Sequence, residues 1–143
     1  MSGERVDLRL DRRAGGAVAF LTIDNRAKLN TLDRALMTDF IGKVETLASL
    51  DDLRALVLRG GGDKAFIGGA SIPEMATLTR DTAREFITLV HRTCDCLRRL
   101  PVPVIAAIDG YAPGWRSPCP AIFGSLRRGR NLACRKRRWA YRR

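Results

Sequence analysis

The sequence predicts an α/β fold in which helices connect neighbouring parallel strands. Two observations support this fold class. Segments with strand-like and helix-like patterns alternate between residues 6 and 108, and the last strand-like segment is entirely apolar, as buried parallel strands are. Residues 112–143 show neither pattern, so the sequence divides into an ordered part, residues 1–111, and a tail.

Two strand-like segments open the chain. Residues 6–11 alternate apolar and polar side chains, and residues 18–24 are mostly apolar. Residues 14–17 contain two adjacent glycines, which are typical of a turn, so a β-hairpin is expected. Residues 25–32 are polar and irregular and are expected to form a loop.

A helix is expected after this loop, because Thr31 and Asp33 are both residues that can cap a helix N-terminus. Residues 53–58 then indicate a short strand, and three consecutive glycines follow at residues 60–62. Apolar residues at helical spacing would form the buried stripe of the helix, namely Leu36, Phe40, Val44 and Leu47.

A second glycine loop, residues 67–70, leads into a short helix that is expected to begin near Ser71. A longer helix is expected over residues 81–100, and two prolines after it prevent its continuation. Residues 104–108 are all apolar and indicate a buried strand. The buried side of the longer helix would consist of Phe86, Leu89, Val90 and Leu97.

Charge is distributed unevenly along the chain. Up to Tyr111 the sequence contains 16 Lys and Arg and 15 Asp and Glu, a net charge of +1. Residues 112–143 contain 10 Lys and Arg and no acidic residue, so nearly all of the net charge of +11 lies in the tail. The tail has no sustained apolar period and is expected to be disordered.

Composition also excludes several classes of protein. No apolar run is long enough to span a membrane, and the N-terminus lacks the apolar segment of a secretory signal, so a cytoplasmic location is expected. The four cysteines are then expected to be reduced thiols, and their spacing does not suit a zinc site. We expect no metal.

Three segments of the ordered part resemble one enzyme family. Residues 64–75, KAFIGGASIPEM, resemble the pattern A-F-x-x-G-A-D-I-x-x-M, and residues 101–112, PVPVIAAIDGYA, resemble P-x-P-V-I-A-A-I-x-G-Y-A. Residues 21–32, LTIDNRAKLNTL, are similar to L-x-x-P/N-x-x-x-N-A-L. Together they resemble the enoyl-CoA hydratase/isomerase, or crotonase, family. The resemblance covers residues 6–112, about the first half of a typical member, and implies an incomplete crotonase-like spiral of β-β-α units.

The resemblance implies a binding site for an acyl-CoA thioester. The backbone N–H of Ala70 would donate to the thioester oxygen, which gains negative charge when the substrate becomes enolate-like, and Gly68 and Gly69 would shape the loop. Ser71 stands where the family often has Asp and would still cap the next helix. The expected substrate-binding residues are Lys28, Leu29, Ala65, Phe66, Gly68, Gly69, Ala70, Ser71 and Ile72, with coenzyme A present only as part of the substrate.

Residues 112–143 do not continue the resemblance. The family's second oxyanion donor lies in a glycine run that would fall around Gly114, where Trp115 interrupts it. The two catalytic glutamates of the family have no counterpart, because no Asp or Glu follows Asp109. The full-length parent is expected to be a homo-oligomer that acts on 2-enoyl-CoA, whereas this chain is expected to be inactive.

A change of reading frame would explain the tail. When the last base of each codon is read with the first two bases of the next, the residues after Pro113 permit Gly-Leu-Glu and, later, Pro-Glu. Both resemble motifs that the family carries next. We therefore expect a small insertion or deletion in the codons of residues 112–114.

Two other functions are compatible with the sequence. The tail places Trp115, Trp139 and Tyr141 among its arginines, which is the composition of an arm that binds nucleic acid, although basic charge alone gives only nonspecific binding. The other alternative is a binder of acyl-CoA that has no catalytic activity.

Overall fold

The computed structural model describes residues 4–112, and it confirms the predicted α/β fold class over that range. Gly114 and the rest of residues 113–143 lie outside the described residues. The expected disorder of the tail and its interrupted glycine run therefore stay predictions.

Four strands form the main sheet in the order β1-β2-β4-β6. The first two strands pair antiparallel and form the predicted hairpin, whereas β2, β4 and β6 are parallel to one another. Parallel neighbours need a crossover between them, and helices supply both crossovers here. The bounds are β1 (Arg5–Arg13), β2 (Gly16–Asp24), β4 (Leu53–Gly60) and β6 (Val104–Ala107).

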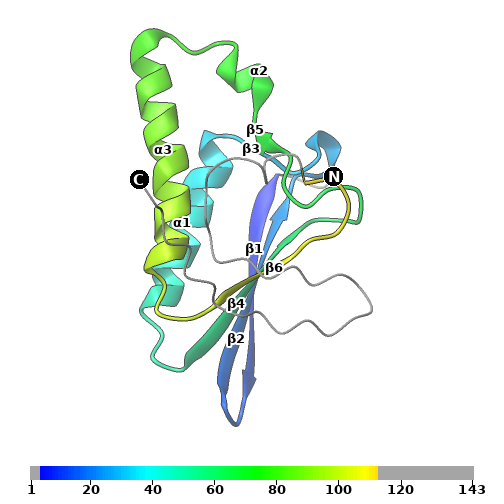
Figure 1. Cartoon of the computed structure of the whole chain (residues 1–143), viewed down its shortest axis with the longest axis vertical. Helices are drawn as coiled ribbons and strands as arrows, with labels where there is room; N and C mark the ends of the chain where they lie inside the picture. Colours follow the sequence, from blue (N-terminus) through cyan, green and yellow to red (C-terminus); the bar gives the residue numbers. More distant parts are fainter. Residues whose placement is uncertain (1–3, 113–143) are drawn as a thin grey trace, which may run out of the picture.

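Helices α1 (Arg34–Ala48) and α3 (Arg80–Arg99) lie side by side over one face of this sheet (Figure 1). Alternate side chains of the strands point toward the helices and form a continuous apolar core with them. The whole predicted stripe of α1 is buried in this core, and so are Met37 and Ile41, which widen the stripe beyond the prediction.

The ends of both helices have identifiable signals. Asp33, rather than Thr31, caps α1, because its Oδ1 accepts the Leu36 N–H at 2.8 Å. A capping box between Thr79 and Thr82 begins α3. The helix ends at Arg99, before the prolines, as expected. On its inner side Phe86, Thr93 and Leu97 are buried, whereas the predicted Leu89 and Val90 are half-buried.

Two predicted loops, the polar one at residues 25–32 and the glycine loop at residues 67–70, are more regular than expected. Residues 25–32 contain a 3-10 turn, η1 (Arg26–Lys28), and a short strand, β3 (Thr31–Leu32). The second loop contributes β5 (Gly69–Ala70), which pairs parallel with β3. Helix α2 (Ile72–Met75) follows directly. This second sheet lies beyond the end of β2 (Figure 1).

The other face of the main sheet is charged along β1, and it is apolar but only half-buried at its centre. Phe20, Val57 and Ile105 form one row across three neighbouring strands, and the Arg9 guanidinium carbon lies 5.0 Å from the centre of the Phe20 ring. Ile87 of α3 is also exposed. None of the helices within residues 4–112 has the length and apolarity that a membrane span requires.

Candidate functional site

The candidate site lies where the parallel strands of the main sheet end. The carboxyl ends of β2, β4 and β6 lie at the same edge of the sheet, because the three strands run in the same direction. In open α/β sheets, this edge is the usual place for ligands. Three loops meet there: residues 25–30, 61–68 and 108–112.

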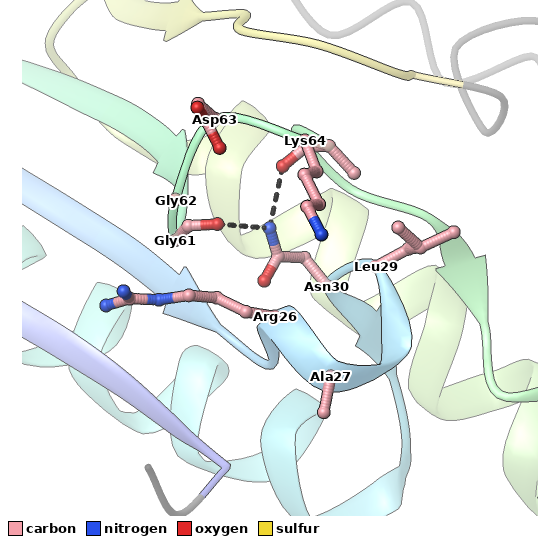
Figure 2. Close-up of a pocket in the computed structure, with 9 residues that line it drawn as sticks. Arg26, Ala27, Leu29, Asn30, Gly61, Gly62, Asp63 and Lys64 are labelled. Atoms are coloured by element: carbon pink, nitrogen blue, oxygen red, sulfur yellow. Dashed lines mark hydrogen bonds between the residues drawn. The ribbon is translucent and has the colours of Figure 1, made fainter.

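Asn30 links the first of these loops to the second. Its Nδ2 donates to the carbonyl oxygens of Gly61, at 3.0 Å, and Ala65, at 2.7 Å (Figure 2). Its Oδ1 accepts the backbone N–H of Asn25 at 2.9 Å. The residue is only 1% exposed, so these bonds have little competition from water. One carboxamide therefore fixes the distance between two loops.

The backbone around Asn30 supports the same arrangement. Leu29 and Asn30 have positive φ angles of 54° and 55°, a conformation that asparagine adopts more readily than most residues. The carbonyl oxygen of Asn30 accepts the Gly68 N–H at 3.3 Å. A Cβ atom at Gly68 would lie 2.5 Å from the carbonyl oxygen of Leu29, so only glycine allows the two loops to approach this closely.

The third loop is joined to the second by backbone hydrogen bonds. The N–H of Phe66 donates to the Tyr111 carbonyl, and the N–H of Tyr111 donates to the Lys64 carbonyl, both at 2.9 Å. The glycine before Tyr111, Gly110, has a φ of 72° and packs closely on the backbone of residues 63–64. The loop that follows β4 is thus held from both sides.

A cavity of about 340 Å³ opens between the first two loops (Figure 2). The Lys64 side chain extends back over Asn30, whereas the Arg26 guanidinium points away from Lys64. The lining of the cavity therefore includes one cation that is directed inward, Lys64. The lining residues are Arg26, Ala27, Leu29, Asn30, Gly61, Gly62, Asp63, Lys64 and Ala65.

Arg26 is held outward by Asp24. The Asp24 carboxylate is almost fully buried and accepts two hydrogen bonds of 2.8 Å from the Arg26 guanidinium. These bonds lower the pKa of Asp24 below its ordinary value of 3.8, although burial opposes the shift. Asp24 therefore stays ionised at neutral pH and anchors the start of the first loop.

The pairing of β3 with β5 fixes the direction of the Ala70 N–H. In a parallel ladder, one residue of each pair bonds to both neighbours of the other residue. Leu32 has this role opposite Ala70, because its carbonyl accepts the Ser71 N–H at 2.8 Å. The Ala70 N–H therefore points away from β3, toward the side of β5 that has no strand partner within residues 4–112.

Exposed apolar side chains lie next to this N–H in the sequence. Ile72 is 76% exposed and Met75 is 45% exposed, both on α2, and Leu29 of the first loop is also exposed. Large apolar side chains in such positions are candidates for contact with an apolar ligand. The site therefore combines a mostly apolar cavity that Lys64 enters, a directed backbone donor outside the lining of that cavity, and exposed apolar side chains on α2.

The structure gives other predicted residues different surroundings. The Phe66 side chain is buried in the core, and the Lys28 ammonium pairs with Glu4 at 2.5 Å, which raises the pKa of Lys28. Lys28 is not among the residues that line the cavity. Ser71 occupies the N-cap position of α2, but its side chain makes no capping hydrogen bond, so the expected capping by Ser71 is wrong.

Some features of the site go beyond the sequence prediction. Asn30 and Lys64 belong to the segments on which the family resemblance rests, but the Asn30 carboxamide contacts and the cavity beside Gly61 and Lys64 were not predicted. A signal for Gly61 and Lys64 is their position directly after a buried strand, because ligand sites of open α/β sheets lie at the carboxyl ends of the strands. No comparable signal marks the Asn30 contacts.

A second cavity, of about 260 Å³, lies between α1 and α3 and is lined in part by Cys96. Burial raises the pKa of this thiol to about 11, so it is protonated and unreactive at neutral pH. Among the described residues, Cys94 and Cys96 are not joined to each other by a disulfide. Within the described part of the chain, no group of side chains is suited to hold a metal ion.

Comparisons with known proteins agree with this arrangement. A sequence model described as "Enoyl-CoA hydratase/isomerase" matches residues 13–115. The chain is 33% identical over 97 residues to the putative enoyl-CoA hydratase/isomerase YngF of Bacillus subtilis, a match that covers 68% of this chain and 37% of the relative. It is 32% identical over 99 residues to the short-chain-enoyl-CoA hydratase of Clostridium acetobutylicum, covering 69% and 38%.

Solved structures give the same result. The enoyl-CoA hydratase of Bacillus anthracis matches with a TM-score of 0.65 and 28% identity over 72% of this chain and 40% of that chain. The enoyl-CoA hydratase of Mycobacterium smegmatis matches with a TM-score of 0.63 and 34% identity, covering 71% and 39%. The predicted crotonase-like fold is therefore confirmed, and the chain spans about two fifths of the length of these relatives.

The Asn30 contacts predict a large and pH-dependent effect of Asn30→Asp. The carboxylate keeps the acceptor for Asn25 but loses both donors and faces two carbonyl oxygens. We expect a loss of roughly 3 kcal/mol in the free energy of unfolding at pH 7, measured by urea denaturation. Burial will raise the pKa of the new carboxyl, so the loss should shrink as the pH falls toward that value. An equal loss at pH 7 and pH 4.5 would contradict this account.

The Asp24–Arg26 pair predicts a contribution to the free energy of unfolding that decreases as the pH falls. The lowered pKa of Asp24 stabilises the fold above pH 4, and this stabilisation is lost as the pH falls through the folded-state value. Arg26→Gln should raise the pKa of Asp24 in an NMR titration of its carboxyl carbon. Arg12→Gln, which removes a distant ion pair with Asp52, is the control and should leave that titration unchanged.

Proposed function

Because the chain belongs to the enoyl-CoA hydratase/isomerase family, we propose that its three loops form the thioester-binding part of an enzyme that acts on 2-enoyl-CoA. The observation that carries this proposal is the direction of the Ala70 N–H. Among the described residues the strand partner of β5 is β3, and the Ala70 N–H points away from it. Residues 61–65, which line the cavity, precede β5 along the chain, and the exposed side chains of α2 follow it.

The Ala70 N–H would stabilise the negative charge that develops on the thioester oxygen. A donor that is already oriented needs no reorganisation during the reaction, and losing one such donor typically costs about 3 kcal/mol of transition-state stabilisation. The β3–β5 pairing supplies this orientation, and Gly69, with a φ of 101°, has open space in place of a side chain. Helix α2 contributes little to the field at this position, since it has only four residues.

The two ends of the substrate would contact different parts of the site. Lys64 and the backbone of residues 61–65 would bind the polar coenzyme A portion, since an ammonium group attracts phosphate. Lys28 could join them only by leaving Glu4. Ile72, Met75 and Leu29 would contact the acyl chain and remove apolar surface from water.

We propose that the 143-residue chain binds acyl-CoA without hydrating it. Hydration needs a group that activates water and a group that transfers the proton, and the family uses two carboxylates for these roles. The carboxylates of this sequence all precede residue 110. We also propose that the second oxyanion donor of the full-length parent lies at the position that corresponds to Gly114. The full-length parent would form a homo-oligomer.

A frame change near residues 112–114 remains our proposal for the origin of the tail. One fact supports it: the family match ends at residue 115. The alternative is a functional arm that binds nucleic acid, which the ten basic residues of the tail favour. Such an arm would have to prefer a sequence or structure, because basic charge alone binds any nucleic acid.

Ala70 variants test the proposed donor. We expect [1-13C]butyryl-CoA to bind saturably and its carbonyl resonance to move downfield, because a hydrogen bond polarises the thioester. Ala70→Pro removes the N–H but neither of the two bonds that Leu32 makes, so it should abolish the shift, whereas Ala70→Gly should keep it. Equal carbonyl shifts in the unaltered chain, Ala70→Pro and Ala70→Gly would refute the role of Ala70.

A second comparison tests the role of Lys64. Butyryl-pantetheine, which lacks the nucleotide, should bind more weakly than butyryl-CoA, and Lys64→Gln should narrow that difference in affinity.

Sequencing of the gene tests the origin of the tail. We expect another frame to open near the codon of Ala112 and to encode Gly-Leu-Glu and, further on, Pro-Glu. The measurement is a read from the codon of Ile108 past the stop codon, translated in all frames. A single open frame without these motifs would establish the basic tail as genuine and would favour the nucleic-acid alternative.

A further inference from the structure

Helix α2 is attached to the rest of the molecule by few contacts. It has four residues, none of them buried, and it lies between β5 and α3 at one end of the molecule (Figure 1). The residue before it, Ser71, donates its backbone N–H to the Leu32 carbonyl of β3. Apolar packing therefore does not determine where Ile72 and Met75 lie.

One side chain of α2 makes a stronger contact. Glu74 accepts the backbone N–H of Arg34 at 3.1 Å through Oε2, and its Oε1 lies 3.2 Å from the Arg34 Nε. The Glu74 side chain is 24% exposed, so the pair is partly shielded from water. Glu74 thus binds both the first backbone N–H of α1 and the guanidinium of the same residue, which adds direction to a charge-assisted contact.

Arg34 also contacts the start of α3. Its NH2 group donates to the Thr82 carbonyl at 2.9 Å, its NH1 group lies 3.3 Å from the Glu85 carboxylate, and its guanidinium carbon lies 6.0 Å from the centre of the Phe86 ring. The guanidinium therefore connects the N-terminus of α1, the middle of α2 and the first turns of α3. No other ion pair of the described residues joins three helices.

We propose that the Arg34–Glu74 pair is a latch that sets the acyl-chain preference of the site. The latch holds α2, whose exposed side chains Ile72 and Met75 follow the Ala70 donor along the chain, and the proposal rests on the acyl-CoA function proposed above. When the ion pair is broken, α2 loses the guanidinium contact that connects it to α1 and α3, so Ile72 and Met75 are no longer held in one position. Arg34 is a positioning residue, since it touches neither the cavity nor the donor.

Hydrogen exchange of the unliganded chain tests the latch itself. In Arg34→Gln and in Glu74→Gln, the hydrogen-bonded amides of residues 75–78 should exchange about five to ten times faster than in the unaltered chain, because a partly shielded ion pair has been lost. The amides of β2 and β4 should be unchanged. Arg12→Gln, which breaks the distant pair with Asp52, is the matched control and should not affect residues 75–78. Unchanged exchange in both latch variants would overturn the proposal.

Binding by acyl-CoAs of different length tests the specificity role. We expect the unaltered chain to bind hexanoyl-CoA more tightly than acetyl-CoA, and each latch variant to reduce that ratio about threefold to tenfold. Binding of free coenzyme A should change less than twofold, because the cavity is not altered. A ratio that stays constant in variants with faster exchange would overturn the specificity role. If the unaltered chain binds none of these compounds, the proposed function fails together with that role, and the exchange rates still decide whether the latch exists.

Discussion

The hydrogen bonds of the Asn30 carboxamide hold the described loops in place. The parallel strands β2 and β4 bring two polar loops to the same edge, where the Gly68 N–H donates to the Asn30 carbonyl. The Asn30 side chain strengthens this connection, since it donates to two carbonyls of one loop and accepts from the other. A shorter side chain would not reach both, and a charged one would be buried without a counterion. The β3–β5 pairing, which orients the Ala70 N–H, follows these two loops along the chain.

The sequence predicts the parts of the fold that are periodic. The stripe of α1 and the alternation of β1 and β2 repeat over several turns or residue pairs, so neighbouring positions support one another. Asn30 has no such support, because a buried asparagine and a solvated one have the same sequence. The two-residue strands β3 and β5 are too short to show alternation, and only tertiary contact with each other defines them. The capping role of Ser71 was wrong because the nature of a residue does not fix where its hydroxyl points.

The site separates its tasks between elements of different rigidity. The cavity and the Ala70 donor depend on strands and on buried backbone bonds, which tolerate little displacement. The exposed apolar side chains Ile72 and Met75 depend on α2, a four-residue helix that has no buried side chain. Under the proposed function, the constant part of the ligand would lie against rigid elements and the variable part against an adjustable one. The half-buried row at Phe20, Val57 and Ile105 lies on the far side of the main sheet and takes no part in this division.

The parallel topology also determines the order in which the chain can fold. The hairpin of β1 and β2 needs only a short loop to close, so it can form early. Pairing β2 with β4, and then β4 with β6, requires closure of two helical crossovers, which is entropically costly before any contact compensates for it. The bonds between Tyr111 and the loop after β4 depend on the last of these steps. The loops of the candidate site therefore depend on contacts between segments far apart in the sequence, which are the slowest kind to form.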